Sequence, residues 1–326
     1  MHAQKINFKF MQESLLQLDN IRINFSAGGM HVINIVLAFV MFGVALGIRP
    51  IMFKEVFRHP KSALVGLFSQ IIALPAITFL LVISLNHWIT PMVAMGMILV
   101  AACPGGNISN FMSQFSKANT ELAISLTAIS TASATFITPF NFWFWGSMYV
   151  NFVNKRAVDA LQTLDIPIFQ MFETVFILLG VPLILGMLTV RFFPKIAEKL
   201  KKPMQYFSLV FFVVMVALAF GNNLDLFVKY IFFVFILVFI HNTIVLGTGY
   251  GLATAFRLSD RDRRTLTIET GIQNSGLGLV LLFNPKIFPP DLAIGGMLFI
   301  TAWWGIWHIV SGLSISFYWS RKPPVE

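Results

Sequence analysis

Long apolar runs constrain this chain more than any other feature of its sequence. About nine of them are long enough to cross a bilayer, since a helical span needs about 20 mostly apolar residues. Each run predicts a helix, because a segment in lipid must satisfy its backbone hydrogen bonds internally. We therefore expect an all-α polytopic membrane protein. The runs cover residues 30–48, 62–85, 91–115, 121–146, 167–191, 204–221, 226–256, 264–284 and 291–318.

Composition narrows the functional classes. Hydrophobic residues make up 57% of the chain and charged residues 11%, with a mean hydropathy of +0.78, which lies outside the range of soluble domains. The basic residues form no stripe with interleaved aromatics, so no nucleic acid partner is expected despite the net charge of +9. The single cysteine, Cys103, excludes an intramolecular disulfide. HExxH, paired-aspartate and GxSxG motifs are missing from the sequence, so no enzyme is expected.

Basic loops predict the orientation in the membrane. Lysines and arginines follow the first, third, fifth, seventh and last runs, and the positive-inside rule places these loops in the cytoplasm. The N-terminus is then outside and the C-terminus is cytoplasmic, in a plasma membrane or a bacterial inner membrane. The expected parts are a flexible or interfacial lead-in (1–29), a first half (30–146), a connector with the fifth run (147–203), a second half (204–318) and a tail (319–326).

Two of the runs contain polar residues and helix breakers. In the third run, Pro104 removes a backbone donor, and Gly105 and Gly106 weaken a helix. In the eighth run, Glu269 is an ionisable group at membrane depth, which by default indicates a functional site. We expect the helices to break at Pro104, Gly105, Gly106, Gly271 and Gly276.

The placement of the interrupted runs suggests internal symmetry. The first four runs begin outside and the last four begin inside, and the third member of each group is the interrupted one. This order predicts an inverted repeat, in which broken helices form a site near the middle of the membrane.

At these motifs the sequence resembles the bile acid:sodium symporter family. The resemblance is carried by PGGNISN (104–110), ETGIQNSG (269–276) and Gln70 in SQIIALP. It implies two broken helices that cross at mid-membrane, with a four-span core that moves against a panel of the first, fifth and sixth runs. It also implies sodium-coupled import of an organic anion, bile-acid-like or a small carboxylate, by alternating access.

The resemblance further implies two sodium sites behind a substrate cavity. The first would use Ser109, Asn110, Thr127 and Glu269. The second would use Gln70, Glu269 and Gln273, with backbone carbonyls near Thr270 and Ile272. All these groups offer oxygen, the ligand that hard cations take.

The sequence departs from the family pattern at one position of the first site. Ala123 stands where a serine hydroxyl is usual. Thr120, Ser125 or water could compensate, and the number of bound cations stays open.

Several alternatives remain open at this level. Asn107, Asn274 and Ser275 could face the substrate, although Asn274 and Ser275 could instead satisfy the broken helix. His241 could bind a proton or substrate, or be structural. Glu269 could carry a proton in a proton-coupled or uncoupled anion carrier, or could pair with Arg263 or Arg264. Cys103 could bind a metalloid in an efflux carrier. No obligate protein partner is expected.

Overall fold

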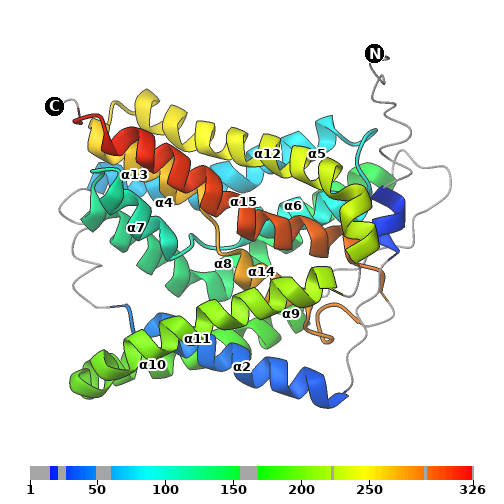
Figure 1. The fold of residues 1–326 in the computed structure, drawn as a ribbon, viewed down its shortest axis with the longest axis horizontal. Coiled ribbons are helices and arrows are strands. Elements are labelled where there is room, and N and C mark those ends of the chain that lie inside the picture. Colours follow the sequence, from blue (N-terminus) through cyan, green and yellow to red (C-terminus); the bar gives the residue numbers. More distant parts are fainter. Residues whose placement is uncertain are drawn as a thin grey trace.

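The computed structural model describes residues 15–20, 27–48, 60–154, 168–221, 224–289 and 292–324 (Figure 1). Within these ranges the secondary structure is helical, apart from one isolated antiparallel pairing between Gly105 and Gln273. The prediction of an all-helical chain is confirmed for this part of the molecule.

Each expected run coincides with one helix or with an interrupted helix. The α-helices are α2 (Ala27–Ala45), α4 (Pro60–Phe68), α5 (Leu74–Ser84), α6 (Pro91–Ala102), α7 (Ile108–Phe115), α8 (Thr120–Asn154), α9 (Ile168–Val175), α10 (Val181–Phe192), α11 (Pro194–Gly221), α12 (Leu224–Ala255), α13 (Asp260–Gly271), α14 (Ser275–Leu282) and α15 (Gly295–Ser320). By length and composition, four described segments can cross a membrane, namely Pro60–Ser84, Thr120–Asn154, Ile231–Ala255 and Gly295–Ser320.

Two π-helical turns interrupt the helices of the second and fifth apolar runs. η1 (Ser69–Ala73) joins α4 to α5, and η2 (Phe176–Gly180) joins α9 to α10. A proline follows each turn, Pro75 and Pro182. A proline ring clashes with the preceding turn of an α-helix and lacks an N–H, so the wider turn lets the helix continue. The first of these turns carries Gln70.

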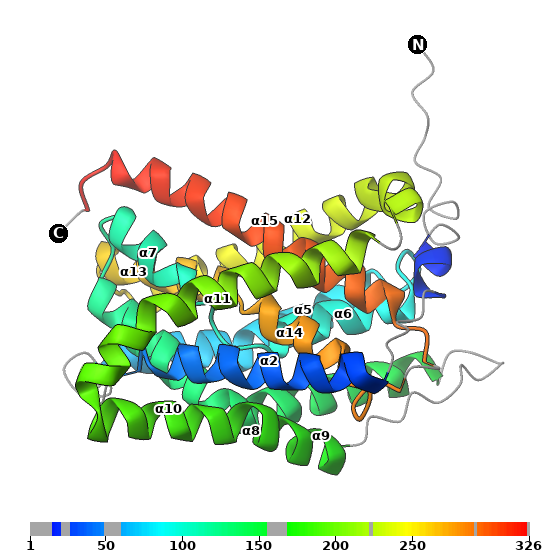
Figure 2. The same ribbon diagram turned by 60° about the horizontal axis from the view of Figure 1, so that its bottom comes forward.

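The helices form two groups that lie against each other (Figures 1 and 2). The α2, α10 and α11 helices lie together, with α9 leading into α10, and these are the three runs expected to form a panel. Their backbones approach closely, since a Cβ added at Gly186 would lie 2.4 Å from the Cβ of Ala45. The remaining helices contain six of the expected runs, and among them α12 and α15 pack directly on α13 and α6.

Part of the N-terminal lead-in is docked on the bundle. Residues 15–20 form a short helical turn in which the side chains of Leu15 and Leu18 are fully buried. The Asp19 carboxylate accepts a hydrogen bond from the Thr90 hydroxyl (2.9 Å) and another from the Met92 N–H in the first turn of α6. These residues are therefore packed on the bundle rather than flexible, because they bury apolar side chains and cap a helix. Residues 1–14 and 21–26 lie outside the described ranges.

Candidate cation and substrate site

The two interrupted helices cross and bond to each other. Cys103 and Ile272, which follow α6 and α13, have extended backbone. The Gly106 N–H donates to the Ile272 carbonyl (2.8 Å), and the Asn274 N–H donates to the Pro104 carbonyl (2.8 Å). Backbone groups freed by the breaks thus satisfy each other, which is what non-helical backbone at membrane depth requires.

Glycine is required at the crossing because of close approach. A Cβ at Gly105 would lie 3.2 Å from the Gln70 Nε2 and 3.3 Å from the Glu269 Oε2. A Cβ at Gly106 would lie 3.2 Å from the Gln273 carbonyl oxygen. The two glycines therefore leave room beside the carboxylate and let the two chains meet.

The second break is shorter than the sequence predicts. Gly271 is the last residue of α13, and its carbonyl accepts a hydrogen bond from the Asn242 side chain (2.9 Å). The prediction of a break at Gly276 is wrong, since this residue lies in the first turn of α14. Helix formation resumes there because the Asn274 Oδ1 caps the Leu277 N–H (3.1 Å).

The Glu269 carboxylate lies at the centre of the crossing and is fully buried. It accepts hydrogen bonds from the Ser109 hydroxyl, from the Thr127 hydroxyl (2.9 Å) and from the Gln70 amide (3.2 Å). All these donors are neutral, and they come from α7, α8 and η1. One acid therefore joins three elements that are distant in sequence.

No basic side chain pairs with Glu269 among the described residues. Arg264 forms an ion pair with Asp260 (2.8 Å) and donates to carbonyls near the end of the chain, and Arg263 donates to the Leu258 carbonyl. The alternative in which Glu269 pairs with one of these arginines is wrong. A buried carboxylate without a counter-charge is costly, so this position favours a bound cation or a proton.

Further oxygen atoms surround the carboxylate. The Asn110 Oδ1 accepts from the Thr127 hydroxyl (3.4 Å), and the Thr270 hydroxyl lies 2.8 Å from the Ser69 hydroxyl. The side-chain carbonyl oxygens of Gln70 and Gln273 are buried and have no hydrogen-bond partner among the described residues. The described residues contain no cluster of three or more His, Cys, Asp or Glu that could hold a transition metal. This all-oxygen set fits sodium, which takes carbonyl, hydroxyl and carboxylate ligands.

Ala123 stands at the position of the first cation site where the family pattern has a serine hydroxyl. Ala123 is buried in α8, one turn before Thr127, on the same face of the helix. Ser125 stands two residues before Thr127 and therefore on another side of α8, and its hydroxyl donates to the Glu121 carbonyl of its own helix (2.8 Å). Ser113, one turn after Ser109, is buried with an unpartnered hydroxyl. Sequence reasoning missed Ser113, although the four-residue spacing from Ser109 would have indicated it.

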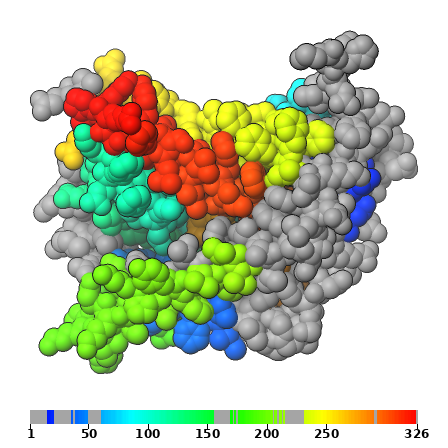
Figure 3. Space-filling view, viewed as in Figure 1, coloured from blue at the N-terminus to red at the C-terminus, as the bar shows by residue number. Residues whose placement is uncertain are grey.

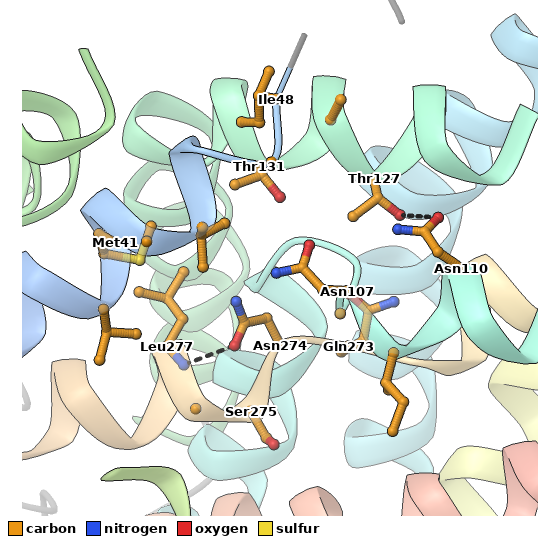
Figure 4. A pocket seen from close by; sticks show the side chains of 18 of the residues that line it. Met41, Ile48, Asn107, Asn110, Thr127, Thr131, Gln273, Asn274, Ser275 and Leu277 are labelled. Atoms are coloured by element: carbon orange, nitrogen blue, oxygen red, sulfur yellow. Dashed lines mark hydrogen bonds between the residues drawn. The ribbon is translucent and has the colours of Figure 1, made fainter. Parts of the chain in front are cut away.

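A cavity of about 590 Å³ lies beside the crossing (Figure 4). Its walls come from the C-terminal half of α2, from α8, α11 and α15, and from both breaks. Asn107, Asn274 and Ser275 line it, as expected of substrate-facing residues, and Thr127 and Gln273 lie at its border with the carboxylate site. Figure 3 shows α10 and α11 lying across from α7 and α15 on one face of the molecule.

His241, for which the sequence leaves both a substrate-facing and a structural role open, is not among the residues that line this cavity. Its Nε2 lies 2.8 Å from the Thr78 hydroxyl, and its ring packs against Trp304 at a centroid distance of 4.8 Å. These two contacts hold it between α5, α12 and α15, which favours the structural alternative. His308 lines the cavity instead. Nothing in the surrounding tryptophan-rich sequence distinguishes His308 from an interfacial residue.

Two interrupted helices that cross around a buried acid, beside a cavity, have the architecture of secondary transporters. The chain belongs to the Sodium Bile acid symporter family, whose model matches residues 34–230. It is accordingly a multi-pass membrane protein of a family that transports with sodium.

Relatives support the assignment. The chain is 30% identical over 290 residues to the uncharacterized sodium-dependent transporter YocS of Bacillus subtilis, covering 89% of this chain and 83% of that protein. It is 28% identical over 263 residues to human sodium/bile acid cotransporter 4, covering 80% of this chain and 57% of that protein. For a probable sodium/metabolite cotransporter of rice, BASS2, the identity is 27% over 277 residues, with 82% and 62% covered. The chain thus spans less than two thirds of the length of the last two proteins.

Proposed function

We propose that this protein is a sodium-coupled symporter of an organic anion that works by alternating access. The observation that carries the proposal is the Glu269 carboxylate, which is fully buried and receives only neutral hydrogen bonds within the described residues. A bound sodium ion supplies the missing positive charge. The same carboxylate contacts both interrupted helices, so cation binding stabilises their crossing.

The proposed ligands fall into two sets that share the carboxylate. The first set is Ser109, Asn110, Thr127 and Glu269. The second set is Glu269, the unpartnered carbonyl oxygens of Gln70 and Gln273, and the backbone carbonyls of Thr270 and Ile272. Both backbone carbonyls already accept one hydrogen bond, and each has a second lone pair. Two sodium ions around one carboxylate leave a local charge of +1, which favours an anion in the adjoining cavity.

The transport path follows from the position of the cavity. Its lining reaches Gly47, Ile48 and Lys201, which adjoin the basic segments that the positive-inside rule assigns to the cytoplasm. We assign this arrangement to an inward-facing state of a nine-span inverted repeat with its N-terminus outside. Movement of α2, α10 and α11 against the other helices would then open the cavity to the opposite side.

Uptake into proteoliposomes tests the coupling. Labelled organic anions are presented with an inward sodium gradient, and with the same gradient of potassium or choline. The proposal predicts accumulation of at least one anion that requires sodium. Equal uptake in the three cases would contradict it.

Proton coupling is the second candidate, and one observation favours it. Ala123 leaves the first cation site one oxygen short, and a protonated Glu269 would be compatible with its burial. In the same proteoliposomes, uptake driven by a pH gradient and indifferent to sodium would select this candidate.

A further inference from the structure

The cavity contains one charged side chain that the cation site does not explain. Lys201 lines it from α11, whereas the polar residues of the crossing line it from the other group of helices. The neighbouring lysines Lys195, Lys199 and Lys202 are exposed, whereas Lys201 is half-buried. All four belong to the same basic segment, so the positive-inside rule accounts for the charge of the segment but not for this inward position.

Lys201 has no acidic partner among the described residues, where the ion pair found is that of Arg264 with Asp260. A half-buried ammonium beside apolar surface gains from an anionic partner, because its hydration is incomplete. The other cavity-lining residues are neutral or are histidine. The cavity therefore offers one fixed positive charge to whatever occupies it.

The other lining residues indicate the size and polarity of the molecule that the cavity can hold. An apolar wall is formed by Val40, Met41, Val44, Ile48, Leu277 and Val280. Lys201 and Phe211 both line the cavity, and ten residues of helix separate them by roughly 15 Å. A volume of about 590 Å³ lies within the range of pockets for drug-sized molecules. This combination suits an elongated amphipathic molecule better than a compact polar metabolite.

We propose that Lys201 binds the acidic group of the transported anion, whose apolar part lies along α2. The inference rests on the proposed function, because it takes the occupant of the cavity to be the transported anion. Lys201 belongs to the α2, α10 and α11 group, whereas Asn107 and Asn274 belong to the other group. A bound anion thus links the two groups that move in transport.

Equilibrium binding to the full chain in lipid nanodiscs tests this assignment. The probes are radiolabelled cholate and its uncharged methyl ester, each measured in sodium and in potassium, with empty nanodiscs subtracted. We expect the wild type to prefer the acid. Lys201→Ala should weaken acid binding about tenfold, as expected for loss of a hydrogen bond to a charged group, and should leave ester binding unchanged. Lys201→Arg, which keeps the charge, should retain most of the affinity.

Lys202→Ala is the matched control, since it removes an exposed charge from the neighbouring position. Equal losses in Lys201→Ala and Lys202→Ala, or a wild type without preference for the acid, would overturn the inference. Acid binding that depends on Lys201 but not on sodium would contradict the proposed coupling and leave the role of Lys201 intact. Acid binding that depends on sodium but not on Lys201 would overturn the inference alone.

Discussion

Glu269 and the glycines opposite it determine what the middle of this protein can bind. The carboxylate is surrounded by two hydroxyls and one amide from three segments, and Gly105 leaves open the space next to its Oε2. Residues of this kind can be identified from sequence alone, because a charge and a Pro-Gly-Gly break within an apolar run are local signals. The contacts of His241 could not be predicted in this way. They involve Thr78 and Trp304, which are far away in the chain.

A methyl group at Gly105 tests the space beside the carboxylate. In Gly105→Ala the new Cβ would lie 3.2 to 3.3 Å from the Gln70 Nε2 and the Glu269 Oε2, so these ligands must shift. We expect sodium affinity to fall about tenfold, a loss of about 1.4 kcal/mol. The measurement is the sodium concentration that gives half of the maximal thermal stabilisation.

Gly251→Ala is the control for this variant. Gly251 lies in α12, and a Cβ there would meet nothing within 4 Å. Its sodium titration should match the wild type, and its stability should be equal or higher by up to about 1 kcal/mol. If Gly105→Ala also titrates like the wild type, the carboxylate site described here is not the sodium site.

The missing hydroxyl of the first site can be supplied by mutation. Ala123→Ser places an oxygen one turn before Thr127 on the face of α8 that carries the Thr127 hydroxyl. We expect tighter sodium binding and a steeper dependence of uptake on sodium concentration. Ala134→Ser, at another buried position of α8, should change neither. An unchanged titration in Ala123→Ser would indicate that the hydroxyl is not needed.

At the scale of elements, the breaks and caps decide which segments meet. The pairing of Gly106 with Ile272 and of Asn274 with Pro104 joins two helices from opposite halves of the chain. The sequence predicts both interruptions, but not the π-helical turn that carries Gln70 or the docking of residues 15–20. The turn accompanies Pro75, whose effect on the helix an apolar pattern does not report, and the docking depends on the packing of segments far apart in the chain.

The docked N-terminal turn gives a prediction on pH. Burial raises the pKa of Asp19 to about 7, and the hydrogen bonds from Thr90 and Met92 lower it by less. Because the pKa is higher in the folded state than in the unfolded chain, the folded state binds the proton more tightly. The stability that this proton contributes is complete below about pH 4 and is lost as the pH rises through about 7.

Asp19→Asn isolates this effect, because asparagine can still accept the hydrogen bond from Thr90 but does not titrate. The stability of the variant relative to the wild type should rise by about 2 to 3 kcal/mol between pH 5 and pH 8, since the variant avoids a buried negative charge. Parallel stability curves for wild type and variant between these pH values would contradict the prediction.

At the scale of the whole molecule, the two groups of helices enclose the cavity, and the proposed cation site lies on one side of it only. All the proposed sodium ligands belong to the crossing and its neighbours α7, α8 and η1, whereas α2 and α11 contribute part of the apolar wall and Lys201. The grouping of α2, α10 and α11 was predictable from the resemblance to a family. The inward position of Lys201 was not, because four lysines of one loop look equivalent in sequence.

Binding of radioactive sodium to the purified protein, compared between wild type and Glu269→Gln, is the most direct test of the crossing as a cation site. Glutamine keeps the shape and an acceptor oxygen but removes the charge, so the fold should survive. Glu121→Gln, at an exposed position of α8, serves as the control. The account predicts saturable sodium binding in the wild type and the control and its loss in Glu269→Gln. Saturable binding of equal affinity in all three proteins would contradict it.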